Sequence, residues 1–208
     1  MTKSLITATK DNDIDTVKLL LQDEKYDVNK TDKYGMTAFN IACEKGFTQI
    51  VELLIKNENV DVNETNESDI SPFYNACKSG NYDIIKLLLD DSRYNSTNLN
   101  KVGYRNTTPF NVACWHNKVN VVELLLTNYD RVNVNTPNEY NMTPFNFACR
   151  NGRLEIVNLL LNEKRIDVNK ANEYGITPYK SALNGKYYDI IKLLTLCERV
   201  HLNPNLFL

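Results

Sequence analysis

The stretch Thr143-Pro144-Phe145-Asn146-Phe147-Ala148-Cys149 sets a pattern that the chain repeats in four other places. With this stretch included, the copies begin at residues 37, 71, 108, 143 and 177, at intervals of 34, 37, 35 and 34 residues. A nearly fixed period of this length indicates a stacked array, because one such unit is too small to bury its own apolar face.

Each copy predicts two helices joined by a sharp turn. Thr or Ser before Pro supplies an N-cap hydroxyl and a first helical residue that needs no N–H. The second helix is apolar along one face, and we expect its Leu124 and Leu159 to be buried. The chain reverses between the helices, where a positive φ is favoured. That position holds Gly46, Gly80, Asn117, Gly152 and, in the last copy, Lys186.

The segment after the second helix reads Asp-Val-Asn in three copies, at residues 27–29, 61–63 and 167–169. Together with the Thr-Pro stretches, these segments resemble ankyrin repeats over almost the whole chain. The resemblance implies an all-α ankyrin-repeat solenoid of about six repeats, with β-hairpin-like fingers between helix pairs. The chain departs from the family where a histidine usually follows Thr-Pro-Leu, which bears on hydrogen bonding between repeats and not on the fold. Asn40, Tyr74, Asn111, Asn146 and Lys180 occupy that position here.

The period predicts one elongated domain, in which only neighbouring repeats are in contact. Its repeats span about 3–31, 32–65, 66–102, 103–137, 138–171 and 172–200, and a C-terminal tail spans 201–208. The first repeat is more polar than the others, as an outer capping repeat requires. The longest interval places a loop insertion at 90–97. The tail either folds back over the last helix or marks where a longer protein was cut.

Composition argues against several classes of partner and site. The 24 basic and 26 acidic residues give a net charge of −2, so no basic field favours nucleic acid. A run of about 18 apolar residues, which a membrane span needs, is missing, as is a hydrophobic signal core at the start. Four of the five cysteines occupy equivalent positions on helices roughly 8–10 Å apart, which is too far for disulfides. We therefore expect buried thiols and an intracellular location, cytoplasmic or nuclear.

Catalytic motifs are also missing. Cys114-Trp115-His116 is the one place where a thiol neighbours an imidazole, but adjacent helical residues do not face each other. We expect no enzyme activity and no catalytic, cofactor-binding or metal site.

The resemblance implies a concave binding surface made of the fingers and the exposed side of the first helices. Tyr, Trp, Met and Arg, which are enriched in protein interfaces, recur at these positions. Alternatively, each tyrosine packs on the neighbouring finger and stiffens the array. The predicted contact residues are Lys33, Tyr34, Met36, Tyr104, Arg105, Trp115, His116, Glu139, Tyr140, Met142, Arg150, Glu173, Tyr174 and Ile176.

The function that the resemblance implies is non-catalytic protein binding by an adaptor, scaffold or inhibitory subunit, a monomer when unbound. The alternative is a regulatory ankyrin domain or a fragment of a larger enzyme or channel. Asn29, Asn63 and Asn169 also resemble the ankyrin-family sites of iron- and 2-oxoglutarate-dependent asparaginyl hydroxylases. The structural alternative is that these asparagines hold the finger turn by bonding nearby backbone.

Overall fold

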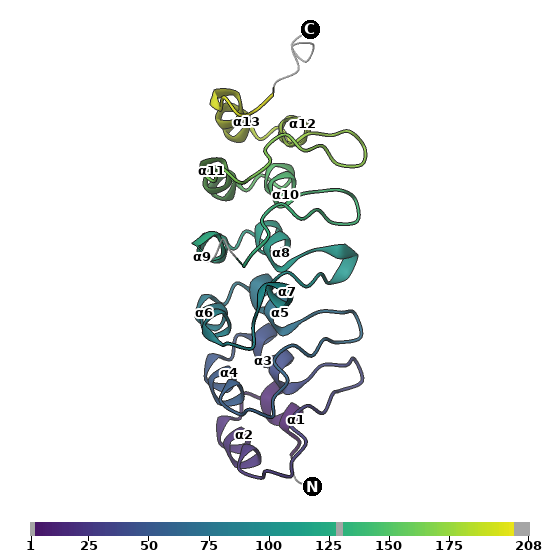
Figure 1. The fold of residues 1–208 in the computed structure, drawn as a ribbon, viewed down its shortest axis with the longest axis vertical. Helices are drawn as coiled ribbons and strands as arrows, with labels where there is room; N and C mark the ends of the chain where they lie inside the picture. The colour runs from purple at the N-terminus through teal and green to yellow at the C-terminus, as the bar shows by residue number, and fades with distance from the viewer. Residues whose placement is uncertain (1–2, 128–130, 202–208) are drawn as a thin grey trace. The chain divides into compact units, whose positions relative to one another are not determined.

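The computed structural model describes residues 3–127 and 131–201, and over these residues it is helical with no strand (Figure 1). Residues up to Tyr104 form one compact unit, and residues from Arg105 onward form a second. Each unit contains three consecutive helix pairs. The all-α fold expected from the sequence is confirmed.

The first unit contains α1 (Leu5–Lys10) with α2 (Ile14–Leu21), α3 (Ala38–Lys45) with α4 (Thr48–Ile55), α5 (Pro72–Ser79) with α6 (Tyr82–Asp90), and the short α7 (Ser96–Leu99). A 3₁₀ turn, η1 (Tyr104–Asn106), lies where the units meet in sequence. The second unit contains α8 (Pro109–Trp115) with α9 (Val119–Thr127), α10 (Pro144–Arg150) with α11 (Leu154–Asn162), and α12 (Pro178–Asn184) with α13 (Tyr188–Leu196). The first helices pack on one another, α3 between α1 and α5, and α10 between α8 and α12.

The ends of the helices follow the chemistry of the repeat. The Thr143 hydroxyl accepts a hydrogen bond from the Asn146 N–H at 3.2 Å, and the other five Thr or Ser N-caps, that of α1 included, make the same bond. Asn117 and Lys186 take up the reversal with φ of 57°, as the sequence indicates. This left-handed conformation is uncommon for lysine, so the last turn is the strained one.

One aromatic residue per repeat anchors the core of each unit. Phe39, Phe73, Phe110 and Phe145 are fully buried, and so are the four repeated cysteines, three of which (Cys43, Cys114 and Cys149) have thiol pKa values raised by burial. On the second helices the buried leucines include Leu54 and Leu88 in the first unit and Leu125, Leu160 and Leu194 in the second. Leu124 and Leu159, which we expected to be buried, are half-buried, because the buried face runs through residues 121, 122 and 125 in α9.

The insertion at 90–97 is not simply a loop, because it leads into α7. The Asn95 side chain caps this helix and the Asn98 side chain bonds back to the Asn95 N–H, a reciprocal capping box. Tyr94 is buried, with its hydroxyl donating to the Val62 carbonyl at 2.7 Å and its ring 5.8 Å from Phe73. The extra residues thus add a short helical turn to the first unit.

In four of the fingers, the segments that lead into the next first helix, one Asp or Asn side chain orders the tip. In the finger before α10, Asn138 Oδ1 accepts from the backbone N–H groups of Tyr140 and Met142, both at 3.0 Å. The Asn138 N–H also donates to the Met142 carbonyl at 3.0 Å, so the finger has a hairpin-like bond without a strand. The next finger is joined to this one by the Glu173 N–H, which donates to the Tyr140 carbonyl at 3.1 Å.

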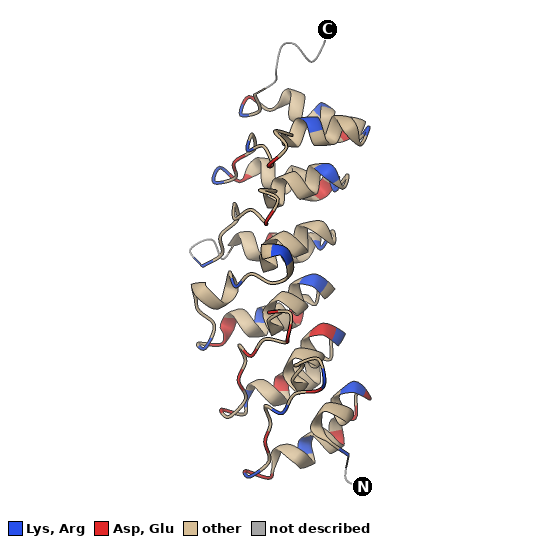
Figure 2. Ribbon diagram, turned by 90° about the vertical axis from the view of Figure 1, so that its right-hand side faces the viewer, with Lys and Arg blue, Asp and Glu red and all other residues tan. Residues whose placement is uncertain are grey.

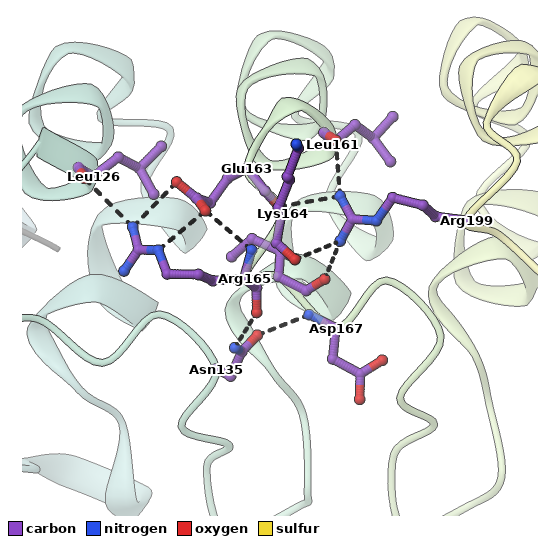
Figure 3. A network of polar contacts seen from close by, with 9 residues as sticks. Leu126, Asn135, Leu161, Glu163, Lys164, Arg165, Asp167 and Arg199 are labelled. Carbon is purple, nitrogen blue, oxygen red and sulfur yellow. Dashed lines mark hydrogen bonds and ion pairs between the residues drawn. The ribbon is translucent and has the colours of Figure 1, made fainter.

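Asparagine and arginine side chains tie successive repeats together beside the second helices (Figure 3). Asn135 Nδ2 donates to the Arg165 carbonyl at 2.6 Å, and Asn135 Oδ1 accepts from the Asp167 N–H at 2.9 Å. Arg199 Nη1 donates to the carbonyls of Leu161 and Glu163, both at 3.1 Å. A cation is favourable at this place because the last carbonyls of a helix lack partners.

The same pattern continues to the end of the described residues. The His201 N–H donates to Asn169 Oδ1 at 2.7 Å, as Asp167 does to Asn135 one repeat earlier. The predicted fold-back of the tail concerns residues 202–208, which lie outside the described part of the chain.

Candidate functional site

The fourteen predicted contact residues divide into three groups by exposure. Two are half-buried, Tyr140 and Ile176, and two are buried, Met36 and Met142. The exposed ones are Lys33, Tyr34, Tyr104, Arg105, Trp115, His116, Glu139, Arg150, Glu173 and Tyr174. We call the surface that they form on the fingers and on the C-terminal ends of the first helices the finger face, and we describe it separately for each unit.

The prediction that Met36 and Met142 are exposed is wrong. Each residue immediately precedes an N-cap threonine, and its side chain lies at the base of the finger, where the following residues or the next repeat cover it. Asn66 Nδ2 of the next finger lies 3.3 Å from Met36 Sδ, and Arg150 Nη1 lies 3.3 Å from Met142 Sδ. These thioethers therefore belong to the interior that supports the finger.

The most distinctive part of the finger face is a stacked pair of aromatic rings in the second unit, which we call the aromatic pair. Trp115, the last residue of α8, is 41% exposed, and its ring centroid lies 5.3 Å from that of Phe147 in α10, with 14° between the ring planes. Phe147 itself is only 5% exposed. Trp115 thus presents one face of its indole over a neighbouring first helix, with a buried phenyl ring beneath it.

Phe147 was missed by the sequence analysis, although the repeat contains a signal. Its equivalents are Ile41, Asn75, Val112 and Ser181, so no other copy has an aromatic residue there. The equivalents of Trp115 are Glu44, Lys78, Arg150 and Asn184, which are all polar. The aromatic pair arises because both positions are exceptional in adjacent repeats.

The aromatic pair replaces a polar link that the first unit retains. Asn75 Nδ2 of α5 donates to Asn40 Oδ1 of α3 at 3.2 Å. Phe147 cannot do the same for Asn111, and Asn111 Oδ1 is buried with no donor among the described residues. A buried unpaired acceptor costs about 1–3 kcal/mol. The second unit thus contains a buried side-chain oxygen without a hydrogen-bond donor at the position where the aromatic pair replaces the polar link.

The Nδ2 groups of these asparagines make the same hydrogen bond in both units. Asn40, Asn111 and Asn146 donate through Nδ2 to the carbonyls of Glu64, Thr136 and Lys170, at 2.8, 3.1 and 2.7 Å. Asparagine therefore bonds to the following repeat from the position where the sequence departs from the ankyrin pattern.

Arg105 lies at the tip of the finger before α8. Its guanidinium carbon is 5.4 Å from the Tyr140 ring centroid, and its Nε is 3.4 Å from Glu139 Oε1. The backbone of Arg105 is left-handed, with φ of 57°, a conformation that an L-residue adopts at a cost of about 1–2 kcal/mol. The alternative in which the tyrosine stiffens the array fits half-buried Tyr140, whose ring is covered by Arg105.

Arg150, at the end of α10, is the cation of the second unit that most resembles a binding group. It is exposed, its Nη1 contacts the weakly accepting Met142 sulfur, and it forms no ion pair with any residue that the structure describes. Tyr174 in the last finger is 73% exposed. A hydrogen bond to the Glu173 carboxylate raises the pKa of Tyr174, and the charge of Arg150 acts in the opposite direction.

The first unit has fewer interface-type residues on its finger face. Tyr34 is 58% exposed with Lys33 Nζ 4.8 Å from its ring centroid, and Tyr104 is equally exposed. Acidic and basic residues are interspersed along the ribbon in both units (Figure 2). Neither unit therefore presents a surface dominated by one sign of charge.

Two of the three asparagines predicted as hydroxylation sites, Asn29 and Asn169, form hydrogen bonds through both ends of their side-chain amides. Asn29 Nδ2 donates to the Asn59 carbonyl at 2.7 Å, and its Oδ1 accepts from the Asp61 N–H at 2.8 Å. Asn169 makes the matching bonds to Arg199 and His201, and Asn63 Nδ2 lies 3.5 Å from the Arg93 carbonyl. These contacts agree with the structural alternative, in which the asparagine joins two repeats.

Within residues 3–127 and 131–201, no group of three His, Cys, Asp or Glu side chains is placed to hold a metal ion. Cys114 is fully buried and its burial raises the thiol pKa, while the His116 ring stacks on Trp115 at 5.9 Å. A shallow groove of about 510 Å³ between α11 and α13 is lined by Leu154, Glu155, Asn158, Asp189, Lys192, Leu193 and Leu196.

A search for membrane-spanning segments found no helix of sufficient length and apolar character in the described chain.

Comparison with known proteins agrees with this architecture. The family model for ankyrin repeats in three copies matches the chain in overlapping segments, at residues 5–98, 58–138, 94–172 and 110–205. The crystal structure of EF0377, an ankyrin repeat protein, is similar with a TM-score of 0.84 and 27% sequence identity, covering 94% of this chain and 98% of that one. A search of curated proteins found no match.

Proposed function

Because the chain belongs to the ankyrin-repeat family, whose repeats generally mediate protein–protein interaction, we propose that its finger face binds a protein partner, with the second unit as the main contact. In this proposal the protein acts as an adaptor, scaffold or inhibitory subunit and carries out no chemistry of its own. The ankyrin fold is typically non-catalytic.

The observation that carries the proposal is the aromatic pair. Trp115 is a large residue at a position that is polar in every other copy, and it stays 41% exposed although a buried ring lies beneath it. Tryptophan, tyrosine and arginine are the residues most enriched at binding hot spots. Arg105, Tyr140, Arg150 and Tyr174 belong to the same unit, so the second unit supplies all three types.

The proposal is tested by selecting partners on the full chain and comparing two variants. Trp115→Ala is expected to weaken binding of the selected partner by about 2 kcal/mol or more, as truncation of a central hot spot does. Its melting temperature is expected to stay close to the parent value, because a partly exposed residue at a helix end supports little of the core. Glu123→Ala changes an exposed residue on second helix α9 and is the matched control.

The outcomes distinguish a role of Trp115 in binding from a role in stabilising the fold. A partner that is lost with Trp115→Ala and kept with Glu123→Ala supports the finger face. A partner kept by both variants would place the binding surface elsewhere. Early melting of Trp115→Ala would show that the aromatic pair mainly supports the fold.

A further inference from the structure

The finger face of the second unit has three properties that together restrict the partner. It offers an exposed indole, it has positive charge without a carboxylate partner, and acidic side chains stand at its finger tips. This inference rests on the proposed function and specifies the chemistry of the partner.

The first property is an indole with an unused donor. Trp115 stacks on Phe147, its ring centroid also lies 5.9 Å from that of His116, and its Nε1–H makes no hydrogen bond with a described residue. Buried indoles usually satisfy this donor within the protein. An exposed one can donate to an oxygen of a bound chain while its ring contacts an apolar side chain.

The second property is an excess of cations over available carboxylates. Arg105 is balanced by Glu139, whose Oε1 lies 3.4 Å from the Arg105 Nε. Arg150 and Lys180 are both exposed and form no ion pair with any described residue. The positions equivalent to Arg150 in the first unit are Glu44 and Lys78, so an arginine here is particular to the second unit.

The third property limits how much negative charge the surface accepts. Glu139 and Glu173 occupy the tips of two successive fingers, joined through the backbone from Glu173 to Tyr140. A phosphate carries nearly two charges and is repelled by neighbouring carboxylates, whereas a single carboxylate is less so. Arginine binds a carboxylate with two parallel hydrogen bonds. The surface therefore suits a singly charged acidic side chain.

From these contacts we infer that the finger face of the second unit recognises an acidic peptide segment in which an Asp or Glu carboxylate, bound by Arg150, stands next to a large apolar side chain that covers Trp115. The Phe147 ring beneath Trp115 holds the indole in place for this contact.

The test uses four pools of short synthetic peptides without tryptophan, each with random flanks and a fixed centre of Glu-Phe, Gln-Phe, phosphoserine-Phe or Glu-Ser. Trp115 is the only tryptophan of the chain, so its fluorescence reports binding at this surface directly. The Glu-Phe pool is expected to shift the emission and to bind about tenfold more tightly than the Gln-Phe and Glu-Ser pools.

Variants assign the charge preference to one residue. Arg150→Gln is expected to remove the difference between the Glu-Phe and Gln-Phe pools and to retain weak binding to both. Lys78→Gln, the change at the equivalent position of the first unit, is expected to leave all four affinities unchanged. Raising the salt concentration should weaken binding of the Glu-Phe pool more than binding of the Gln-Phe pool.

The inference is overturned if Glu-Phe and Gln-Phe bind equally, if phosphoserine-Phe binds more tightly than Glu-Phe, or if no pool changes the emission. Failure here is separable from failure of the proposed function. A partner selected on the full chain and lost with Trp115→Ala, yet lacking an acidic segment, would keep the proposed function and refute the acidic partner.

Discussion

The two units join their first helices differently at the same repeat position. In the first unit α5 donates a hydrogen bond from Asn75 to Asn40 of α3, so the link is polar and satisfied. In the second unit Phe147 replaces that donor, Asn111 Oδ1 is left without one among the described residues, and Trp115 stacks on the new ring. The difference shows how one repeat framework provides either a polar helix contact or an aromatic surface by changing two residues in adjacent copies.

The comparison presupposes that the cores of the two units are alike, and the largest expected effect tests this. Leu54 in α4 and Leu125 in α9 are equivalent and fully buried, so Leu54→Ala and Leu125→Ala should each cost about 2–5 kcal/mol. Hydrogen exchange should accelerate most in the altered repeat and its neighbours, because repeats interact with nearest neighbours.

Matched controls are available one residue earlier. Leu53 and Leu124 are half-buried, and their alanine variants should cost clearly less than the changes at Leu54 and Leu125. Uniform loss of protection over both units would contradict the nearest-neighbour description. A large difference between Leu54→Ala and Leu125→Ala would mean that the units differ in more than their first-helix contacts.

The polar link itself is expected to give the next largest effect. Asn75→Ala removes the donor and leaves Asn40 Oδ1 buried and unpaired, which should cost about 1–3 kcal/mol in chemical denaturation. The exposed change Lys78→Ala on the same helix should stay within about 0.5 kcal/mol. If the two variants are equally stable, the link between α3 and α5 contributes nothing and the contrast with the aromatic pair loses its energetic basis.

The regular parts of this comparison follow from the sequence alone. Thr or Ser before the first helix predicts each N-cap, and Asn117 was correctly placed in a left-handed turn because asparagine tolerates that conformation. The contacts between repeats could not be predicted in the same way. The sequence predicts exposed Met36 and Met142, but both are buried, because whether a side chain is covered depends on the residues that pack above it, which the local pattern does not specify.

The aromatic pair could be predicted from the sequence only in part, for the same reason. Trp115 stood out because tryptophan after Ala-Cys is unusual in this chain, yet its partner lies 32 positions later in the next repeat. The insertion at 90–97 has the polar, Asp- and Ser-containing composition of a loop, and the reciprocal bonds of Asn95 and Asn98 order its end as the start of α7. Contacts of this kind depend on how two neighbouring repeats are aligned against each other, and the sequence of a single repeat does not specify that alignment.

The junction asparagines offer a comparison between the units at a smaller scale. Asn135 in the second unit bonds through both amide atoms, at 2.6 and 2.9 Å, whereas Asn63 in the first unit has its Nδ2 contact at 3.5 Å. Asn135→Ala should therefore cost about 1–2 kcal/mol and Asn63→Ala less, since longer hydrogen bonds weaken. Thermal melts of both variants provide the measurement, and equal losses would show that bond length does not distinguish the two junctions.

The smallest expected effect concerns the acid response of the first repeat, which has no counterpart in the second unit. Asp13 caps α2 by accepting from the Thr16 N–H at 3.1 Å and the Thr16 hydroxyl at 2.7 Å, and Lys3 Nζ lies 2.9 Å from its carboxylate. The equivalent residues of the second unit are Lys118, Arg153 and Tyr187, which carry no carboxylate. The hydrogen bonds from Lys3 and then Thr16 lower the pKa of Asp13 from 3.8 to about 2.

A lowered pKa means that the folded state favours the charged carboxylate. Its contribution to stability is therefore fully present above pH 3.8 and is lost as the pH falls towards 2. A carbon-detected NMR titration of the Asp13 carboxyl should give a midpoint near 2, and Lys3→Ala should move the midpoint upward because the first cause of the shift is removed. The midpoint should stay below 3.8 in that variant, since the bonds from Thr16 remain. An unchanged midpoint would assign the shift to the helix cap alone, and Lys3 would then have no part in how the first repeat responds to acid.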